Sequence, residues 1–370
     1  MSKKILFVVN VDWFFISHRL PLALEALKRG YEVHIACGIT DKKEYLESLG
    51  LIVHPLNLSR SGTGIKGEIK AFFEIYRILK EINPNIAHFV TIKPVLYGGI
   101  ASRFINIGKK VFSISGLGFI FIKQGFKASI ARILIKTMYR FALGERKSHV
   151  IVQNPDDKAV VNSIVKVPIT LIRGSGVDLN QYEYKEENNG NVKVSMACRL
   201  LKDKGVFEYI DVVKILKQKL PNVEFELYGD IDIHNPASLT SDDVEKIKKD
   251  GFVNVYGFSI DIAKVFCDSN IVVLPSYREG LPKVLIEAAA CGRAVVTTDV
   301  PGCRDAIEPN VTGLLCEVKD TESLARMIEK LIIDEKLRNR MGHKGRKLAE
   351  QEFDINKVVE KHFDIYEGRV

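Results

Sequence analysis

The chain lacks several motifs by which common enzyme classes are recognised. None of its six cysteines forms a C-x-x-C pair, and no H-E-x-x-H motif or clustered His/Cys set offers a metal site. A P-loop is also absent, and residues 9–16, which follow the first expected strand, contain no glycine and therefore no G-x-G-x-x-G. These absences argue against a dinucleotide-dependent dehydrogenase and leave no metal site to propose.

Long apolar runs are missing as well. The longest apolar stretch, residues 111–122, includes two serines and two glycines and falls short of the roughly 18 to 20 residues that a spanning helix needs. The amino terminus carries two lysines before a short apolar run, residues 5–9, which is typical of a buried strand rather than a secretion signal. Because the cysteines are scattered and several lie in apolar runs, they favour reduced core thiols. We expect a cytoplasmic protein that does not cross a membrane.

The length and the apolar pattern predict two α/β domains. A chain of 370 residues suits two domains of roughly 150 to 200 residues each. Short β-branched runs alternate with longer amphipathic stretches, such as residues 19–29 and 67–82, which is the pattern of parallel strands joined by helices. In the first half the expected strands are residues 4–10, 31–36, 51–55, 85–90, 110–115 and 149–153.

A polar segment at residues 185–191, KEENNGN, interrupts this pattern and is the best linker in the chain. The alternation then restarts, and a helical tail begins at about Thr321. The expected strands of the second half are residues 192–198, 223–228, 253–256, 271–275, 294–298 and 313–317. We therefore predict two Rossmann-like doubly wound domains, residues 1–186 and 187–352, with a helix at 353–370 that crosses back to the first domain. Ligands of such sheets bind beyond the carboxyl ends of the strands, so the site is expected in the cleft between the domains.

The most informative segment is residues 276–292, SYREGLPKVLIEAAACG. An expected strand leads into a glycine turn, and Pro282 is predicted as the first residue of a helix, where its missing amide costs nothing. The backbone from Gly280 through Leu281 and Pro282 to Lys283 would then present free amides backed by the positive end of the helix dipole, which suits a diphosphate. Lys283 opposes that dipole by about 0.3 to 1 kcal/mol unless an anion docks there.

Two glutamates of this segment are candidate sugar ligands. Glu279 precedes the turn and Glu287 lies two turns into the helix, so they are not expected to act as one acid/base pair. Each could accept hydrogen bonds from sugar hydroxyls, or both could be ordinary surface or capping glutamates. Arg199 and Lys204 lie at the carboxyl edge of the second sheet, where they could neutralise the diphosphate as it leaves, although cations near a helix start are common.

Together these segments resemble glycosyltransferase family 4, the retaining GT-B enzymes, and the resemblance covers the whole chain. Glu279 and Glu287 match the family's Glu, seven residues, Glu motif. Arg199 and Lys204 fall where the family places its diphosphate-binding Arg and Lys. Two further matches are GSGVD at residues 174–178, similar to the N-G-V-D turn that closes the family's first domain, and TDVPG at 298–302, similar to its late glycine turn.

The resemblance implies a retaining transferase that needs no metal or cofactor. It would move a hexose or N-acetylhexosamine from a nucleoside-diphosphate sugar, expected to be a UDP-sugar, to a carbohydrate acceptor. Glu287 would hold the ribose and Glu279 the donor sugar, while the two cations hold the phosphates and the turn at Gly257 and Phe258 holds the base. Because similar members often act on lipid-linked acceptors, we expect a role in bacterial surface polysaccharide, lipopolysaccharide or other glycan assembly.

Acceptor binding is predicted in the first domain. Family members often show His-x-His near the end of the fourth strand, and residues 88–90 read HFV here, so that one histidine is missing. His88 could approach the reacting centre or could be a satisfied core histidine. Lys93, at the start of the next helix, is expected to face the cleft, where it could bind an acceptor phosphate. The loop after the first strand lacks the glycine pair of many relatives. It offers four other polar side chains instead: Asp12, Ser17, His18 and Arg19.

Positive charge is concentrated in the first half of the chain. Residues 1–188 hold 27 Lys and Arg against 16 Asp and Glu, whereas residues 189–370 hold 27 against 30. Within residues 119–149, seven cations accompany one anion, Glu145. The apolar side chains at helical spacing there are Phe126, Ile130, Ile133, Leu134 and Phe141, and the cations of a separate stripe are Arg132, Lys136 and Arg140.

Such a helix could lie on an anionic membrane surface, or it could face the core with a solvated basic side. The lipid-linked acceptors of similar family members favour peripheral attachment at the inner face of the cytoplasmic membrane. Nucleic acid is not expected as a partner, because no recognised binding motif accompanies the charge.

Two other functions remain as alternatives. One is a sugar-nucleotide epimerase or hydrolase on the same scaffold, which assays for free sugar or epimer without acceptor would reveal. The other is a non-catalytic partner subunit that binds sugar nucleotide. The presence of all four residues Glu279, Glu287, Arg199 and Lys204 speaks against the second, because a decayed site would not need them.

Overall fold

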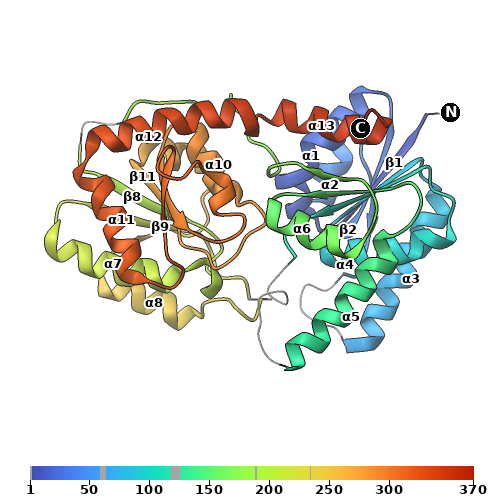
Figure 1. The fold of residues 1–370 in the computed structure, drawn as a ribbon, viewed down its shortest axis with the longest axis horizontal. Coiled ribbons are helices and arrows are strands. Elements are labelled where there is room, and N and C mark those ends of the chain that lie inside the picture. Colours follow the sequence, from blue (N-terminus) through green and yellow to red (C-terminus); the bar gives the residue numbers. More distant parts are fainter. Residues whose placement is uncertain (1, 59–63, 118–125, 188–189, 234) are drawn as a thin grey trace. The chain divides into compact units, whose positions relative to one another are not determined.

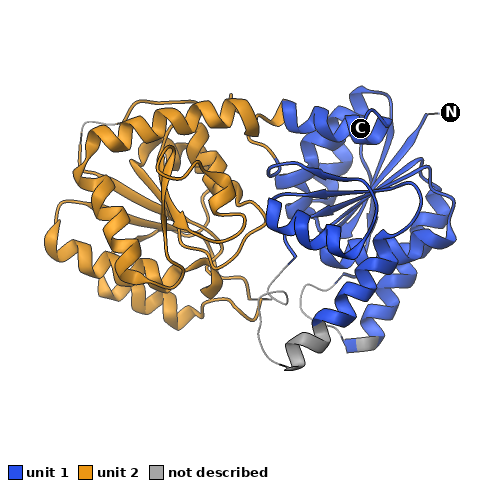
Figure 2. Cartoon of the chain, in the orientation of Figure 1, with its two compact units in different colours: residues 1–175, 357–370 blue, residues 176–356 orange. Residues whose placement is uncertain are grey.

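The computed structural model describes residues 2–58, 64–117, 126–187, 190–233 and 235–370, and it divides the chain into two compact units (Figure 2). The first unit comprises Met1–Ser175 and Lys357–Val370, and the second comprises Gly176–Asn356. Each unit is a parallel sheet flanked by helices (Figure 1).

The division falls eleven residues before the position expected at residue 186. The reason is the backbone pairing of Val177 with the segment around Asp354. The Val177 N–H donates to the Phe353 carbonyl at 2.8 Å, and the Ile355 N–H donates to the Val177 carbonyl at 3.0 Å. These bonds fix the start of the second unit well before the polar segment that the sequence singled out as a linker.

The first unit is built on a parallel sheet with the order β3-β2-β1-β4-β5-β6-β7. Its strands are β1 (Lys4–Val11), β2 (Glu32–Gly38), β3 (Ile52–Pro55), β4 (Ile86–Val90), β5 (Lys109–Ile114), β6 (Ser148–Val152) and β7 (Ile169–Leu171). Its helical segments are α1 (Asp12–Lys28), α2 (Lys43–Ser48), α3 (Gly64–Ile82), α4 (Ile92–Ala101), η1 (Ser102–Phe104), α5 (Phe126–Leu143) and α6 (Pro155–Ile164). The six expected strands are confirmed, and α1 begins seven residues earlier than expected.

The second unit repeats this architecture with the strand order β10-β9-β8-β11-β12-β13. Its strands are β8 (Lys193–Ala197), β9 (Glu224–Tyr228), β10 (Asn254–Val255), β11 (Ile271–Leu274), β12 (Ala294–Thr298) and β13 (Gly313–Cys316). Its helical segments are η3 (Lys202–Lys204), α7 (Val206–Lys219), α8 (Ser241–Asp250), α9 (Ile262–Asp268), α10 (Lys283–Ala290), η4 (Arg304–Ala306), α11 (Thr321–Ile333), α12 (Glu335–Leu348) and a π-helical turn at Ala349–Phe353. The expected helical tail is thus several helices.

The last helix, α13 (Ile355–Glu367), returns the chain to the first unit. Its Phe363 is fully buried, with the Arg29 guanidinium 4.0 Å from the centre of its ring. Glu360 forms an ion pair with the same arginine at 2.5 Å. An apolar residue and a carboxylate of α13 therefore both contact the end of α1, which explains why residues 357–370 belong to this unit.

Both sheets change direction at one point in their strand order. In the first unit, β1 lies between β2 and β4, and in the second, β8 lies between β9 and β11. Because consecutive strands move outward in opposite directions from this point, the loops that follow the two central strands diverge and leave room for a ligand. Each unit therefore has a natural binding position at the carboxyl ends of β1 and β4, or of β8 and β11.

Candidate functional site

The residues expected to bind the donor follow the two central strands of the second sheet. Arg199 lies two residues after the end of β8, and Ser276 lies two residues after the end of β11. The two strands pair in parallel, with Ile271 opposite Val194. Their carboxyl ends therefore open at the same edge, where the loop of Lys204 and the turn of Glu279 meet.

Lys204 and Glu279 form an ion pair at this edge. The Lys204 ammonium contacts the Glu279 Oε1 atom, and the Ser276 hydroxyl donates to the same oxygen at 2.7 Å. Both charged side chains are about 15% exposed. Burial on its own would lower the pKa of Lys204, but the neighbouring Glu279 carboxylate outweighs it and raises this pKa. Lys204 therefore stays protonated at neutral pH and presents a fixed positive charge.

The turn that carries Glu279 is held by backbone contacts on two sides. The Tyr277 N–H donates to the Asp203 carbonyl at 2.9 Å, and the Glu279 N–H donates to the Pro301 carbonyl at 3.2 Å. Gly302 has a φ of +83°, and a Cβ atom there would lie 2.4 Å from the Glu279 carbonyl oxygen. The glycine turn at residues 298–302 is thus required by close backbone packing against the Glu279 turn.

Glu287 lies inside α10 and is nearly buried. Its Oε1 atom accepts from the Tyr182 hydroxyl at 2.7 Å and contacts the Lys283 ammonium at 3.1 Å. Lys283 is therefore compensated by a carboxylate one turn along the helix, so its position in the first turn does not require an anion, contrary to the expectation from the sequence. Pro282 is also displaced from its expected place, because its extended ψ of 124° makes it the residue before the helix.

Arg199 and the turn after β10 complete the residues expected around the donor. Arg199 forms an ion pair with Asp232 at 2.9 Å rather than with either glutamate. In the turn, the ring of Tyr256 stacks on Tyr228 with centroids 4.8 Å apart, and the Gly257 carbonyl accepts from the Gly229 N–H at 2.8 Å. Phe258, the next residue, is largely exposed. The turn is fixed at its base and leaves an aromatic ring available to a ligand.

Three partners in this region were not expected from the sequence as site residues: Tyr182, Ser276 and Asp232. Tyr182 precedes Glu287 by 105 positions. Asp232 follows Arg199 by 33. At such separations no helical or strand periodicity relates the two residues, so the sequence does not indicate that they meet. Ser276 carries a weak signal, since it stands three residues before Glu279 in the same turn.

His88 is a core histidine in the first unit. Its Nδ1 atom lies 2.6 Å from the Tyr366 hydroxyl and its Nε2 atom 2.6 Å from the Ser113 hydroxyl. Burial lowers its pKa well below the usual 6.5, so the ring is neutral. Because both ring nitrogens are occupied inside the fold, the structure favours the second of the two interpretations, and His88 is not placed to act on a substrate.

Two of the four polar residues after β1 are also internal. The fully buried Asp12 carboxylate accepts from the Thr40 N–H at 2.7 Å and from the Thr40 hydroxyl at 2.8 Å, so it anchors the loop after β2. Arg19 is buried, donates to the His18 carbonyl at 2.8 Å and has its pKa lowered by burial to about 10. The expectation that both face an acceptor is corrected. Ser17 remains exposed, with its hydroxyl 2.5 Å from His18 Nδ1.

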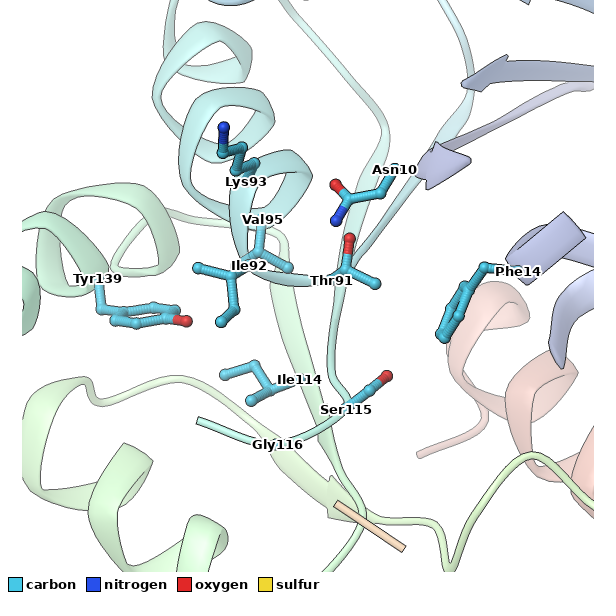
Figure 3. A pocket seen from close by; sticks show the side chains of 10 residues that line it. All are labelled: Asn10, Phe14, Thr91, Ile92, Lys93, Val95, Ile114, Ser115, Gly116 and Tyr139. Atoms are coloured by element: carbon cyan, nitrogen blue, oxygen red, sulfur yellow. The ribbon is translucent and has the colours of Figure 1, made fainter. Parts of the chain in front are cut away.

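Lys93 lies at the start of α4, as expected, and therefore near the carboxyl end of β4. It lines a cavity of about 370 Å³ together with the first turn of α4 (Figure 3). Its ammonium group is 2.6 Å from Glu68 Oε1, and the Tyr97 hydroxyl donates to the other oxygen of that glutamate at 2.5 Å. The lysine charge in this cavity is therefore already balanced by a carboxylate.

The basic segment is helical, but its apolar stripe does not face the core. Ile133 is 67%, Leu134 61% and Phe141 48% exposed, whereas α5 buries Tyr139 and Leu143. The core-facing interpretation is therefore wrong for these three side chains. Lys123 and the side chains of Phe126, Lys127 and Ile130 lie outside the described residues. In the part of the chain that the structure describes, no helix is long and apolar enough to cross a membrane.

Comparison with known proteins gives a matching family model for each unit. A family model described as "Glycosyl transferase 4-like" matches residues 4–154, and one described as "Glycosyl transferases group 1" matches residues 180–348. The chain is 29% identical to the N,N'-diacetylbacillosaminyl-diphospho-undecaprenol alpha-1,3-N-acetylgalactosaminyltransferase of Campylobacter jejuni, an alignment that covers 95% of this chain and 97% of the relative. It is 28% identical to the capsular polysaccharide biosynthesis glycosyltransferase CapM of Staphylococcus aureus, over 99% and 97%.

A solved structure supports the same assignment of the fold. Alr3699/HepE of Anabaena, determined in complex with UDP and glucose, matches with a TM-score of 0.75 and 19% identity over 99% of this chain and all of that one. The two family models together match most of the chain, residues 4–154 and 180–348, and the likeness in fold extends over 99% of it. The chain therefore belongs to the family 4-like glycosyltransferases and has the GT-B fold.

Proposed function

We propose that the protein transfers a hexose or N-acetylhexosamine from a UDP-sugar to a lipid-linked glycan acceptor in bacterial surface polysaccharide assembly. The observation that carries the proposal is the cluster of Lys204, Ser276 and Glu279 at the switch point of the second sheet. The names of the relatives support the acceptor class, since one acts on a diphospho-undecaprenol-linked sugar and another in capsular polysaccharide biosynthesis. The bound UDP of a structural neighbour supports the base.

In the proposed reaction the acceptor hydroxyl oxygen bonds to the anomeric carbon as the bond between that carbon and the diphosphate breaks. The hydroxyl gives up its proton, and negative charge grows on the diphosphate of the departing UDP. Lys204 and Arg199 stabilise this charge, because both are cations at the carboxyl edge of the sheet that holds the donor. The Glu279 carboxylate accepts from a hydroxyl of the transferred sugar, and Glu287 accepts from the ribose. The backbone from Gly280 to Lys283, at the start of α10, faces the phosphates.

We also propose that transfer retains the anomeric configuration and needs no metal, as the resemblance to family 4 implies. The two cations at the donor site supply positive charge of the kind that a metal supplies to a leaving diphosphate in other enzymes. Proton NMR of the product gives the configuration of the new linkage, and an assay in a chelating buffer tests the metal. An inverted product or an activity abolished by chelation would each overturn its part of the proposal.

The donor base can be identified by thermal shift. We expect one nucleotide series among UDP, GDP, ADP and their sugar conjugates to raise Tm, since a ligand at 100 times its Kd adds about 2.7 kcal/mol to the stability of the folded state. The Glu287→Ala variant should bind the nucleotide about tenfold or more weakly, because a charged acceptor for the ribose is removed. The rise in Tm should be smaller accordingly.

Tyr182→Phe is the matched control for that variant. It removes the hydroxyl that bonds to Glu287 but keeps the carboxylate, so it should lower the basal Tm and preserve the nucleotide-induced shift. If none of the nucleotides shifts the wild-type protein, the assignment of the donor site is lost. If Tyr182→Phe and Glu287→Ala lose the shift equally, the carboxylate has no direct role.

We propose that α5 attaches the first unit to an anionic membrane surface. Its exposed apolar side chains, Ile133 and Leu134, share the helix with the exposed cations Lys136 and Arg140. Ile69 and Phe73 of α3 are exposed as well, and α3 and α5 both contact α4 (Figure 1). Apolar side chains between cations on an exposed helix are typical of segments that lie in the membrane interface.

Charge reversal on α5 tests this attachment. The double variant Lys136→Glu/Arg140→Glu should bind vesicles of phosphatidylcholine and phosphatidylglycerol at least about tenfold more weakly, because each cation contributes about 1 kcal/mol near such a surface. Cosedimentation measures the binding, which should also weaken as salt is raised. Lys248→Glu/Lys249→Glu on α8 makes the same change of charge in the second unit and should bind like the wild type. Equal losses in both variants would contradict attachment through α5.

A further inference from the structure

A cavity of about 740 Å³ lies in the first unit at the amino ends of β6 and β7. Ser148, the first residue of β6, and Pro168, which directly precedes β7, both line it. The two strands are parallel neighbours in the sheet, with Val150 opposite Ile169. Because substrates of doubly wound sheets bind at the carboxyl ends of the strands, this cavity is separate from the expected acceptor site.

Positive charge dominates the lining of this cavity. The cations come from η1, from the last turn of α5 and from the loops that precede β6 and β7, and they are Arg103, Arg140, Arg146, Lys147 and Lys166. The carboxylate among the described lining residues is Glu145, which already pairs with Lys110 at 2.6 Å. Within the part of the chain that the structure describes, none of these lining cations forms an ion pair with a carboxylate. A bound anion would relieve the mutual repulsion of their charges.

The helix dipole of α5 accounts for only part of this charge. Arg103 donates from Nε to the Phe141 carbonyl at 2.7 Å and from Nη2 to the Gly144 carbonyl at 3.3 Å, so it bonds to carbonyls at the end of the helix. Its guanidinium carbon also lies 4.2 Å from the centre of the Phe141 ring. Cations are favourable at a helix carboxyl end, and Arg103 serves α5 in this way. The cations of the two loops have no such role, so the helix does not explain them.

The turn that carries two of the loop cations has a fixed backbone. Lys147 has a φ of +65°, a left-handed conformation that is uncommon for any residue except glycine. Its carbonyl accepts from the Lys110 N–H at 2.9 Å, and the Ser148 N–H donates to the Glu145 carbonyl at 3.3 Å. Arg146 and Lys147 are both exposed. They are therefore presented to solvent by a backbone that is already ordered, which lowers the entropy cost of binding a ligand.

The apolar part of the lining and its position select the kind of anion. Phe141 is 48% exposed and lines the cavity beside the cations, which suits an anionic group that carries apolar atoms. Phe141 follows Thr137 by four residues and Ile133 by eight, so the three side chains lie along one row of α5. Because exposed Ile133 belongs to the surface proposed to lie on the membrane, the cavity stands at the end of that surface. Phospholipid headgroups are the anions that a membrane offers there.

We propose that this cavity binds the phosphate headgroup of an anionic phospholipid. Arg140, Arg146, Lys147 and Lys166 surround the phosphate oxygens, to which arginine donates in pairs, and Phe141 packs against the glycerol and the first acyl carbons. The inference rests on the proposed function, since it adds a headgroup site to the attachment of α5. It extends the contact to cations that lie outside that helix.

The double variant Arg146→Gln/Lys166→Gln tests the cavity, because it removes two lining cations from the loops and leaves α5 unchanged. Both side chains are exposed, so the variant should keep the wild-type Tm. Dihexanoylphosphatidylglycerol, used below its micelle concentration, should bind the wild type in isothermal titration calorimetry. The variant should bind it at least about tenfold more weakly, the loss expected for two cations near an anionic headgroup. Dihexanoylphosphatidylcholine, whose headgroup carries no net charge, should bind neither protein.

Two further variants separate the cavity from general surface charge and from α5. Lys248→Gln/Lys249→Gln removes the same charge from α8 and should bind the short-chain lipid like the wild type. Lys136→Gln removes an exposed cation of α5 that does not line the cavity. It should weaken cosedimentation with phosphatidylglycerol vesicles and leave binding of the short-chain lipid unchanged.

The headgroup site is overturned if the short-chain lipid does not bind the wild type or binds Arg146→Gln/Lys166→Gln equally well. Inorganic phosphate or glycerol 1-phosphate binding as tightly as the lipid would also overturn it, because the site would then be one for a free phosphate. Vesicle binding that weakens in Lys136→Gln without any short-chain lipid binding would remove the cavity and keep the attachment of α5. Short-chain lipid binding without vesicle binding would support the cavity and remove the attachment.

Discussion

Lys204→Met is expected to lower kcat/KM by about 10²- to 10³-fold. The substitution removes the fixed positive charge beside the departing diphosphate and keeps the length and apolar stem of the side chain. Preorganised charge of this kind is worth far more in a partly buried site than in water, because it needs no reorganisation as the leaving group develops its charge. Initial rates over a range of donor concentrations measure the effect, which should appear in kcat as well as in the affinity for the donor.

The same variant is expected to lose about 2 kcal/mol of stability. Glu279 would keep the Ser276 hydroxyl but lose its cation, and the loss is smaller than for a fully buried pair because both side chains are partly exposed. Adding Glu279→Gln should restore much of the stability, since an uncompensated charge is removed, and should leave activity low. Stability and catalysis are thereby separated.

Lys214→Met provides the matched control, because Lys214 forms a more exposed ion pair with Asp250 at 2.8 Å in the same unit. Surface pairs of this kind contribute about 1 kcal/mol or less, so its kinetics and stability should stay close to those of the wild type. A Lys204→Met enzyme with activity within fivefold of the wild type would contradict a role for Lys204 in stabilising the leaving group.

The strands could be predicted closely because their sequences carry the signal of burial on both faces. β4 and β6 are short apolar runs that are fully buried, and their expected bounds differ from the observed ones by one residue. β7 was missed because it has three residues, all only partly buried, and therefore no apolar run that distinguishes it from a loop. Length and burial together decide which strands a sequence reveals.

The candidate donor residues were predicted through motifs, but their contacts were not. Lys204 and Glu279 are 75 positions apart, and only the pairing of β8 with β11 brings their loops together. Lys283 shows the opposite case. A lysine in the first turn of a helix opposes the helix dipole, and here its charge is compensated locally by Glu287, one turn along the same helix. A motif identifies residue types, whereas the tertiary fold determines which charge compensates which.

On the acceptor side the sequence could not distinguish buried polar residues from exposed ones. His88 and Asp12 are satisfied by Tyr366 and Thr40, partners at separations of 278 and 28 positions. Whether a polar residue after a strand is free to bind a ligand or is bonded inside the fold therefore depends on partners far away in the sequence.

Gly205→Ala is expected to destabilise the second unit by about 2 to 5 kcal/mol. Gly205 has a φ of +75° at the start of α7, and a Cβ atom there would lie 2.3 Å from the Pro275 carbonyl oxygen. The left-handed conformation alone costs an alanine about 1 to 2 kcal/mol, and the overlap with backbone adds a shift of α7 away from the end of β11. Because Pro275 directly precedes Ser276, this shift should also weaken nucleotide binding.

Gly251→Ala separates the cost of the left-handed conformation from the cost of the overlap with backbone. Gly251 has a similar φ of +71°, but its nearest neighbouring atom lies 4.0 Å from the position of a Cβ. It should lose only the 1 to 2 kcal/mol of the backbone conformation and should bind nucleotide like the wild type. Thermal denaturation followed by circular dichroism compares the two variants, and hydrogen exchange of the β11 amides locates the change. Equal losses of stability would show that the close approach of α7 to β11 contributes nothing, whereas a larger loss in Gly205→Ala with faster exchange in β11 would show that this contact positions the turn of Glu279.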